Sequence, residues 1–477
     1  MHKAPDVLVI MPDQLRGDCL SIAGHPVVKT PALDEIGRQG TYFDAAYTTC
    51  ASCVPARRAL LTGQHPSTNG MVGYKGGYRI PGPTLPQILS DNGYMTAMIG
   101  RYMHQSPYEE PHGFQTRVLA STHVDNDEYA TALKARYPEI KSLRNLGVTF
   151  NGWGAKPWEF DDEMHPTAWV TRRSRDFLTV QSADRPLFLL TSFYAPHPPL
   201  LPPKTYFDRY YRQDLPEPFY GDWNSNTPGS ADEVRMDSPR VHLTGDPLRR
   251  AQAGYFGLIS HIDDQVAPLI REFKERSEQA GRPWIIMLIS DHGEMLGDHN
   301  YFRKCEPYEG SSRIPFLIQG SPQLGWQPGQ TCRTPVCLED VMPTVLAAAG
   351  IAAPGGIDGK SLLSVLAGQA AHVRTRLHCE HAKTYSQEQA YHFLTDGIIK
   401  YIWRPLNGEE QLFHLRQSRG ERHNLADHAE WAEVLVKWRE YMIQTLRDRP
   451  EGFTDGQRLM AGREYKPVLP FLEQFKV

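Results

Sequence analysis

The sequence predicts an α/β protein with a doubly wound, mostly parallel sheet and a smaller C-terminal antiparallel α+β subdomain. Within residues 1–370, continuous apolar and β-branched runs alternate with segments of helical periodicity, which is the pattern of a parallel sheet buried on both faces. Within residues 371–477, short strand-like runs are separated by Asp-Gly and Asn-Gly pairs, which favour antiparallel hairpins. We therefore expect a domain boundary near residue 370.

The first strand is expected at residues 6–11, an apolar run that stops at a proline. Asp13 and Gln14 follow directly. Open α/β sheets bind ligands at the carboxyl ends of their strands, so these two residues lie where a site is expected. Residues 30–40 then predict a helix, because a Thr-Pro pair opens it and a glycine ends it.

Later strands also end in polar residues. These residues are Arg101 and His104, His197, and Asp291 with His292. Because the carboxyl ends of parallel strands meet at one edge of a sheet, we expect their side chains to lie near Asp13. The elements on which this expectation depends are helices at 84–92 and 249–279 and strands at 96–100, 186–191 and 284–290.

Two segments interrupt this alternation. Residues 120–165, which contain Trp153 and Trp158, and residues 198–247 are expected to be long loops inserted over the sheet edge, where substrate-shaping elements usually lie. Peripheral packing is the equal alternative for either tryptophan. In the C-terminal subdomain we expect strands at 391–394, 398–403 and 411–415 and a final helix at 431–447.

Bulk composition limits the classes of function. The chain has 477 residues, a formal net charge of −4 and 22% charged residues, without a long basic run, so a nucleic-acid partner is not expected. Its seven cysteines form no zinc pattern. Apolar runs are too short for a membrane span or a signal-peptide core. We therefore expect no membrane partner and a cytoplasmic location, or a periplasmic or secreted one if a signal was removed. The oligomeric state is not indicated.

The segment Cys53-Val54-Pro55-Ala56-Arg57 combines a nucleophile with a cation. A cysteine at the start of a helix lies among unpaired backbone N–H groups, near the positive end of the helix dipole. The proline suits the first turn, and Arg57 follows about one turn later, so both side chains can reach one volume. The segment predicts an oxyanion pocket beside a sulfur atom. A buried cysteine with a surface arginine is the alternative.

With the Leu-Thr-Gly that ends at residue 63, this segment resembles the C-x-P-x-R signature of the type I sulfatases, members of the alkaline phosphatase superfamily. In that family a maturation enzyme oxidises the cysteine to formylglycine, and the hydrated aldehyde attacks the sulfur of a sulfate ester. The resemblance implies an alkaline-phosphatase-like fold and hydrolysis of sulfate monoesters of a small molecule or an oligosaccharide, with carbohydrate preferred. Cys53 is the candidate, since Cys50 lacks the proline and arginine at these offsets.

Residues 290–299, Ser-Asp-His-Gly-Glu-Met-Leu-Gly-Asp-His, resemble the D-H-G-x-x-x-G-x-H block of the same family. The resemblance implies a divalent metal whose ligands are Asp13, Gln14, the modified Cys53, Asp291 and His292. Calcium is the usual metal of the family. Here, however, Gln14 and His292 stand where Asp and Asn are commonest, and imidazole suits softer metals than calcium. Manganese and magnesium therefore stay open.

The remaining catalytic roles are also implied by the resemblance. Arg57 would polarise the sulfate together with the metal, and Arg101 would bind its oxygens in place of the usual lysine. An arginine cannot carry a proton, which leaves His104 as the base that breaks down the sulfated hemiacetal. Lys304, thirteen residues after Asp291, and His197 would contact the substrate and assist departure of the alcohol.

Two alternatives remain at this point. Gln14 and His292 also occur in the branch of the superfamily that hydrolyses phosphonate monoesters and phosphodiesters, so such a hydrolase is the second enzymatic interpretation. The non-enzymatic interpretation is an anion-binding protein with an unmodified Cys53. The complete set of expected charges argues against this last interpretation.

Overall fold

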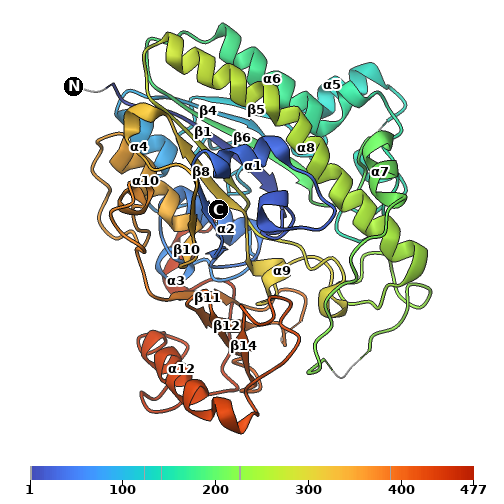
Figure 1. Cartoon of the computed structure of the whole chain (residues 1–477), viewed down its shortest axis with the longest axis vertical. Coiled ribbons are helices and arrows are strands. Elements are labelled where there is room, and N and C mark those ends of the chain that lie inside the picture. Colours follow the sequence, from blue (N-terminus) through green and yellow to red (C-terminus); the bar gives the residue numbers. More distant parts are fainter. Residues whose placement is uncertain (1–2, 123, 141, 225–226, 387) are drawn as a thin grey trace.

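The computed structural model describes residues 3–122, 124–140, 142–224, 227–386 and 388–477. Positions 123, 141, 225 and 226, which belong to the two predicted insertions, lie outside the described residues. Figure 1 shows a larger α/β part, with helices on both sides of a central sheet, and a smaller part formed by the last strands and α12 (Ala432–Thr445). Among the described helices, none is long and apolar enough to cross a membrane. The fold class is the predicted one.

A mostly parallel sheet forms the centre of the larger part. In the described part of the chain its eight strands have the order β5-β4-β6-β1-β7-β8-β2-β9. The first five strands in this order are parallel, and β8 is antiparallel to both of its neighbours. The bounds are β1 Asp6–Asp13, β2 Thr41–Phe43, β4 Met95–Gly100, β5 Thr116–Leu119, β6 Leu187–Pro196, β7 Trp284–Ile289, β8 Phe316–Gly320 and β9 Gln330–Cys332.

Both faces of this sheet are buried, which explains the continuous apolar runs of its strands. In β1, Leu8 and Ile10 belong to one hydrophobic core, and Val7, Val9 and Met11 belong to a second core on the opposite face. Helices cover both faces. The first core contains residues of α1 (Pro31–Arg38), α6 (Pro166–Val180) and α8 (Gly245–Gln279), together with residues of the two insertions. The second core contains residues of α2 (Cys53–Thr62), α4 (Leu85–Asp91), α10 (Val341–Ala348) and α11 (Leu363–Leu366).

The predicted elements of the larger part are present, with shifts at some ends. Strand β6 continues to Pro196, beyond its predicted end at residue 191, because its pairing with β1 extends to Asp13. Helix α8 begins at Gly245, four residues before its predicted start at 249. Strands β2, β5, β8 and β9 have no counterpart among the predicted elements, because runs of three to five residues are too short to show a period.

The two predicted insertions are partly helical, which corrects their description as long loops. Helix α5 (Glu128–Arg136) lies in the first insertion and α7 (Lys204–Tyr211) in the second. Trp153 and Trp158 are buried in the core that also contains residues of α8. Both tryptophans therefore serve packing.

The C-terminal part contains a separate antiparallel sheet, as predicted, with the order β11-β12-β13-β14. Helix α12 packs on this sheet through Trp438 and Met442. The first strand of the sheet has no predicted counterpart, whereas the other three match predicted runs. The bounds are β11 Leu377–His381, β12 Tyr391–Thr395, β13 Ile399–Trp403 and β14 Glu410–His414.

Buried polar contacts fix the C-terminal sheet to the larger part. Lys400 of β13 is fully buried, and its Nζ lies 2.7 Å from Glu309 Oε1 in α9 (Glu309–Ser312). The backbone N–H of Glu380 in β11 donates to the carbonyl of Thr49 at 2.8 Å. These contacts place β11 beside the segment that leads into α2.

Gly293 lies just after β7, where the chain passes close to α9. A Cβ atom built on Gly293 would lie 2.0 Å from the carbonyl oxygen of Gly310, so any side chain forces the backbone to move. We expect Gly293→Ala to lower the free energy of unfolding by about 1–3 kcal/mol, the usual cost of overpacking. Gly76→Ala is the control, because no described atom lies within 4 Å of the Cβ built there. Denaturant unfolding measures both variants, and equal stabilities would contradict the close approach.

Candidate active site

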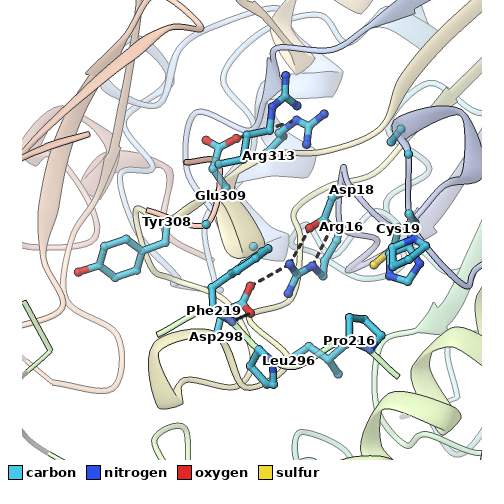
Figure 2. A pocket seen from close by; sticks show the side chains of 18 of the residues that line it. Arg16, Asp18, Cys19, Pro216, Phe219, Leu296, Asp298, Tyr308, Glu309 and Arg313 are labelled. Carbon is cyan, nitrogen blue, oxygen red and sulfur yellow. Dashed lines mark hydrogen bonds and ion pairs between the residues drawn. The ribbon is translucent and has the colours of Figure 1, made fainter. Parts of the chain in front are cut away.

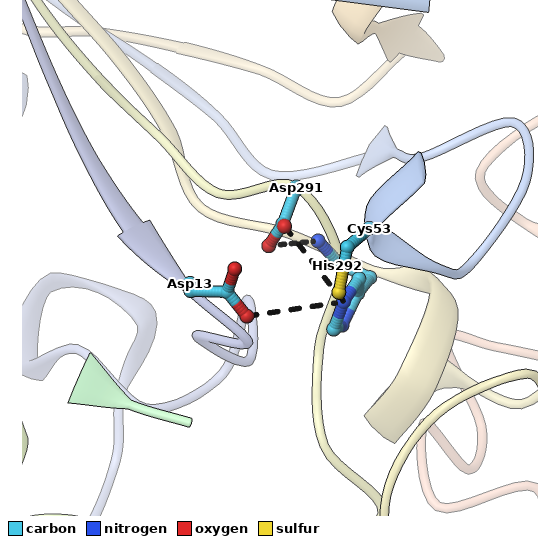
Figure 3. A group of neighbouring side chains, drawn as sticks. All are labelled: Asp13, Cys53, Asp291 and His292. Atoms are coloured by element: carbon cyan, nitrogen blue, oxygen red, sulfur yellow. Dashed lines mark hydrogen bonds and ion pairs between the residues drawn. The ribbon is translucent and has the colours of Figure 1, made fainter. Parts of the chain in front are cut away.

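Asp13, Cys53, Asp291 and His292 meet at the carboxyl edge of the sheet. One donor atom from each lies within 4.8 Å of the others, and all four side chains are buried. Asp13 ends β1, Asp291 and His292 follow the neighbouring strand β7, and Cys53 begins α2. Figure 3 shows the two carboxylates, the imidazole and the sulfur directed toward one small volume. The structure therefore brings together residues that are up to 279 positions apart (292 − 13).

Cys53 is held at the helix start in a cationic environment. Its Sγ lies 3.2 Å from His292 Nε2, and Ser52 before it has an extended backbone conformation. Burial raises the pKa of the thiol, but the charges of Lys304, His292 and Arg101 outweigh this effect and lower the pKa to about 6. The environment thus stabilises negative charge at position 53.

Arg57 lies between the two aspartates. Its Nη2 donates to Asp13 Oδ2 at 2.8 Å and its Nε donates to Asp291 Oδ2 at 2.9 Å, and the side chain is fully buried. Arg57 is not among the residues that line the pocket around Cys53. The structure therefore places this cation behind the carboxylates, with its contacts directed at them.

The carboxylate of Asp13 is incompletely satisfied. Its Oδ2 also lies 2.6 Å from Arg101 Nη1, whereas Oδ1 is buried and has no hydrogen-bond partner among the described residues. Burial, with the nearby charges of Asp291 and Cys53, raises the pKa of Asp13 to about 7 against the effect of Arg101 and Arg57. The pKa of Asp291 stays well below its usual value, because His292 and Arg57 outweigh the effect of its burial.

Gln14 has a left-handed backbone, with φ of 66°, and its side chain is fully buried. Its backbone N–H donates to Asp291 Oδ1 at 3.0 Å. The side-chain Nε2 donates to Glu294 Oε2, so the oxygen Oε1 faces the opposite way and accepts a hydrogen bond from Lys304 Nζ at 2.7 Å. Glu294, which was not predicted as a site residue although it lies in the 290–299 block, therefore orients the amide oxygen.

Lys304 and His197 form a directed pair. His197 Nδ1 donates to the carbonyl of Pro198 at 2.7 Å, which leaves Nε2 as an acceptor for Lys304 Nζ at 2.8 Å. Burial and the charge of Lys304 lower the pKa of His197 well below its ordinary value. Burial opposes the charge of Lys304, but Cys53 and other nearby groups raise its pKa. The lysine is therefore charged and the histidine neutral.

Arg101 and His104 lie beside this pair. Arg101 Nη2 lies 3.3 Å from His104 Nδ1, and its guanidinium lies 4.7 Å from the ring centroid of Tyr194. Burial and the charges of Arg101 and Arg57 lower the pKa of His104 to about 3. His104 is therefore neutral when no anion is bound.

A cavity of ≈ 260 Å³ opens above Cys53. Five predicted residues line it: Cys53, Arg101, His104, His197 and Lys304. The sequence did not indicate the others, which are Tyr74, Asn151, Tyr194, Cys305, Thr384 and Tyr385. Asn151 belongs to the first insertion, which was predicted to reach this edge, whereas no local pattern marks Thr384 and Tyr385 in the C-terminal part.

One further cavity and one further cluster of side chains are less suited to catalysis or metal binding. A cavity of ≈ 600 Å³ surrounds Arg16, but this guanidinium is already paired with Asp18 and Asp298, as Figure 2 shows. His65, His378 and Glu380 also cluster. The two imidazoles, however, are stacked at 5.1 Å with 22° between their planes, so their in-plane lone pairs do not converge on one metal ion.

Comparison with known proteins identifies the family. A sequence profile described as Sulfatase matches residues 5–351, and one described as N-sulphoglucosamine sulphohydrolase, C-terminal, matches residues 297–448. An arylsulfatase of Clostridium perfringens is 35% identical over 96% of this chain and 98% of its own length. A choline-sulfatase of Rhizobium meliloti is 28% identical over 89% of this chain and 82% of its own length.

Solved structures share the fold. A phosphonate monoester hydrolase of Agrobacterium radiobacter has a TM-score of 0.76 and 24% identity, with 93% of this chain and 95% of that chain covered. A protein in complex with its substrate D-glucosamine-2-N,6-O-disulfate has a TM-score of 0.73 and 20% identity, with 93% and 98% covered. Because the Sulfatase profile spans most of the chain and the Clostridium relative matches nearly all of it, this chain belongs to the sulfatase family of enzymes that hydrolyse sulfate esters.

Proposed function

We propose that this chain is a formylglycine-dependent sulfatase that acts on a sulfated carbohydrate. The observation that carries the proposal is the position of Cys53. Its Sγ belongs to the donor group of Asp13, Asp291 and His292, and the same side chain lines the cavity that Lys304 also lines. The complex with a disulfated glucosamine in a protein of the same fold supports a sugar as the sulfated group.

The donor set fits a divalent cation. The buried Oδ1 of Asp13 has no hydrogen-bond partner among the described residues, and His292 Nε2 is 4.0 Å away. With the raised pKa of this group, this arrangement indicates that positive charge is needed beside it. Two carboxylates, the amide of Gln14 and the imidazole of His292 suit manganese or magnesium as well as the calcium that is usual in the family. A cation there would polarise the sulfate, and a hydrated aldehyde at position 53 would supply the hydroxyl nucleophile.

Arg101 and Lys304 are the cations that face the substrate. Both line the cavity and both are buried, so their charges act on the sulfate oxygens in a weakly screened environment. Arg57 acts one step further back, because it holds the two aspartates in position by direct hydrogen bonds. Of these three cations, Arg57 positions the metal ligands, and Arg101 and Lys304 bind the substrate.

We assign the proton transfers to two pairs of neighbouring side chains, each with one charged and one neutral member. These pairs are Lys304 with His197 and Arg101 with His104. Lys304 carries the proton, and its hydrogen bond to His197 Nε2 fixes its direction, so it can protonate the departing alcohol oxygen. His104 is neutral, and an anionic sulfate in the cavity raises its pKa from the low value that Arg101 and Arg57 impose. His104 can therefore accept the proton whose removal releases sulfate.

Position 53 provides the first test. When the chain is expressed with a formylglycine-generating enzyme, we expect the peptide that contains Cys53 to lose the mass that separates a thiol from an aldehyde side chain. Cys53→Ala is expected to lower kcat by more than about 10³-fold without unfolding the protein, because the nucleophile is absent. Cys50→Ala is the control for the mass change. Wild-type kcat in Cys53→Ala would overturn the mechanism.

Glu294 provides a test that does not depend on turnover. Because Glu294 orients the amide of Gln14, we expect Glu294→Gln to weaken metal affinity by about 10–100-fold, as for other groups that orient metal ligands. Titration calorimetry of Mn²⁺ and Ca²⁺ into metal-free protein with an unconverted Cys53 measures the affinity. Glu440→Gln, at an exposed position of α12, is the control. Equal affinity in both variants would show that Glu294 does not position the ligand.

Substrate class requires a direct comparison. A phosphonate monoester is the second candidate substrate, because Arg101 and Lys304 attract either anion. A relative from Trinickia caryophylli also supports this candidate. It is described as a multifunctional alkaline phosphatase superfamily protein and is 29% identical over 79% of this chain and 80% of its own length. We expect kcat/KM to be higher for a sulfated sugar or an aryl sulfate than for phenyl phosphonate monoesters. A phosphonate that reacts about a hundredfold faster than every sulfate, a difference of about 2.7 kcal/mol, would transfer the assignment to phosphonates.

A further inference from the structure

A second cavity, of ≈ 620 Å³, adjoins the catalytic cavity. Tyr385 lines both cavities, and the consecutive residues Cys305 and Glu306 line the first and the second respectively. The walls of the second cavity come from the second insertion, from the segment before α9 and from two loops of the C-terminal sheet, β11–β12 and β13–β14. Its lining includes Arg240, Tyr301, Glu306, Tyr385 and Arg404. The two cavities are therefore neighbours that meet at Tyr385.

Glu306 is the polar centre of the second cavity. Its side chain is 1% exposed, and its Oε1 accepts a hydrogen bond from Gln389 Nε2 at 2.8 Å. Its Oε2 has no hydrogen-bond partner among the described residues, and Arg404 Nη2 is 3.7 Å away. Burial raises the pKa of Glu306. This oxygen has a charged neighbour but no hydrogen bond among the described residues, which is costly for a buried carboxylate, and a ligand hydroxyl would supply the missing hydrogen bond.

The rest of the wall is already fixed by protein contacts. Arg404 donates to the carbonyl of Glu388 at 3.0 Å and to Tyr308 Oη at 3.1 Å. Arg240 Nη2 donates to Asn224 Oδ1 at 2.7 Å. Lining groups are thus held in place before any ligand enters, which lowers the entropic cost of binding.

The chemistry of this wall differs from that of the catalytic cavity. Cationic Arg240 and Arg404 are balanced by acidic residues, which are Glu306, Glu388 and Glu409, so the cavity does not select a second anion. Tyr301 and Tyr385 add aromatic surface, and an amphipathic tyrosine contacts both the C–H faces and the hydroxyls of a polar ring. Paired polar groups, aromatic surface and an unsatisfied acceptor suit an uncharged, hydroxyl-rich ligand.

We propose that the second cavity is a subsite for an unsulfated sugar residue linked to the sulfated one, so that the preferred substrate is a sulfated di- or oligosaccharide. This inference rests on the proposed function. The catalytic cavity, at ≈ 260 Å³, has room for the sulfate and the ring that carries it, and the next ring lies beyond Tyr385. Binding energy from this remote ring would be used to raise kcat/KM.

The experiment compares substrates that differ only by the second ring. It uses wild-type protein with converted Cys53, 4-nitrophenyl sulfate, and a panel of sulfated disaccharides with their matching monosaccharide sulfates. Glu306→Gln and Tyr301→Ala test the subsite. Tyr220→Ala is the matched control for Tyr301→Ala. Tyr220 lies in the second insertion, is 38% exposed and lines neither cavity.

We expect the preferred disaccharide to exceed its monosaccharide at least tenfold in kcat/KM. Glu306→Gln and Tyr301→Ala should each remove most of this advantage while kcat/KM for 4-nitrophenyl sulfate stays within about twofold. Thermal unfolding of each variant checks its folding. A wild-type enzyme that does not prefer any disaccharide, or variants that affect both substrates equally, overturns the subsite. Absence of hydrolysis of every sulfate, 4-nitrophenyl sulfate included, instead overturns the proposed function.

Discussion

The burial of two aspartates at the ends of adjacent parallel strands is the constraint on which the site depends. Asp13 and Asp291 are both fully buried, and burial of unpaired carboxylates is costly. Arg57 bonds to both of them and Arg101 pairs with Asp13. One oxygen of Asp13 still has no hydrogen-bond partner among the described residues, with His292 Nε2 4.0 Å away, and the proposed divalent cation would complete the balance of charge at this point.

This balance of charge also determines where the nucleophile lies. Arg57 follows Cys53 by one turn of α2, so the hydrogen bonds that bind Arg57 to the two aspartates also fix the helix start against the sheet. Cys53 then lies beside the two carboxylates and lines the same cavity as Lys304. Two residues of one short segment therefore have different positions: Cys53 lines the cavity, whereas Arg57 lies outside its lining and bonds to Asp13 and Asp291.

The sequence predicts the inner part of the site well and the outer part poorly, for a physical reason. Asp13, Asp291 and His292 follow strands that are buried on both faces, and such strands produce unmistakable apolar runs that fix where their carboxyl ends lie. Tyr385 reaches both cavities because β11 docks beside the segment before α2, and no local pattern encodes such docking. Trp153 and Trp158 illustrate the same limit, since their burial depends on the distant helix α8.

The attachment of the C-terminal sheet connects substrate choice with catalysis. Glu380 bonds to Thr49, and Ser52 Oγ lies 2.7 Å from His381 Nε2, so β11 is fixed to the residues that immediately precede Cys53. Tyr385 lies four residues beyond the end of β11, and it lines both cavities. The position of Tyr385 relative to Cys53 therefore depends on a few backbone and side-chain hydrogen bonds. Under the proposed function, sequence changes in the loop after β11 would alter which alcohol is accepted without moving Asp13, Asp291 and His292, because these three residues are anchored to the central sheet.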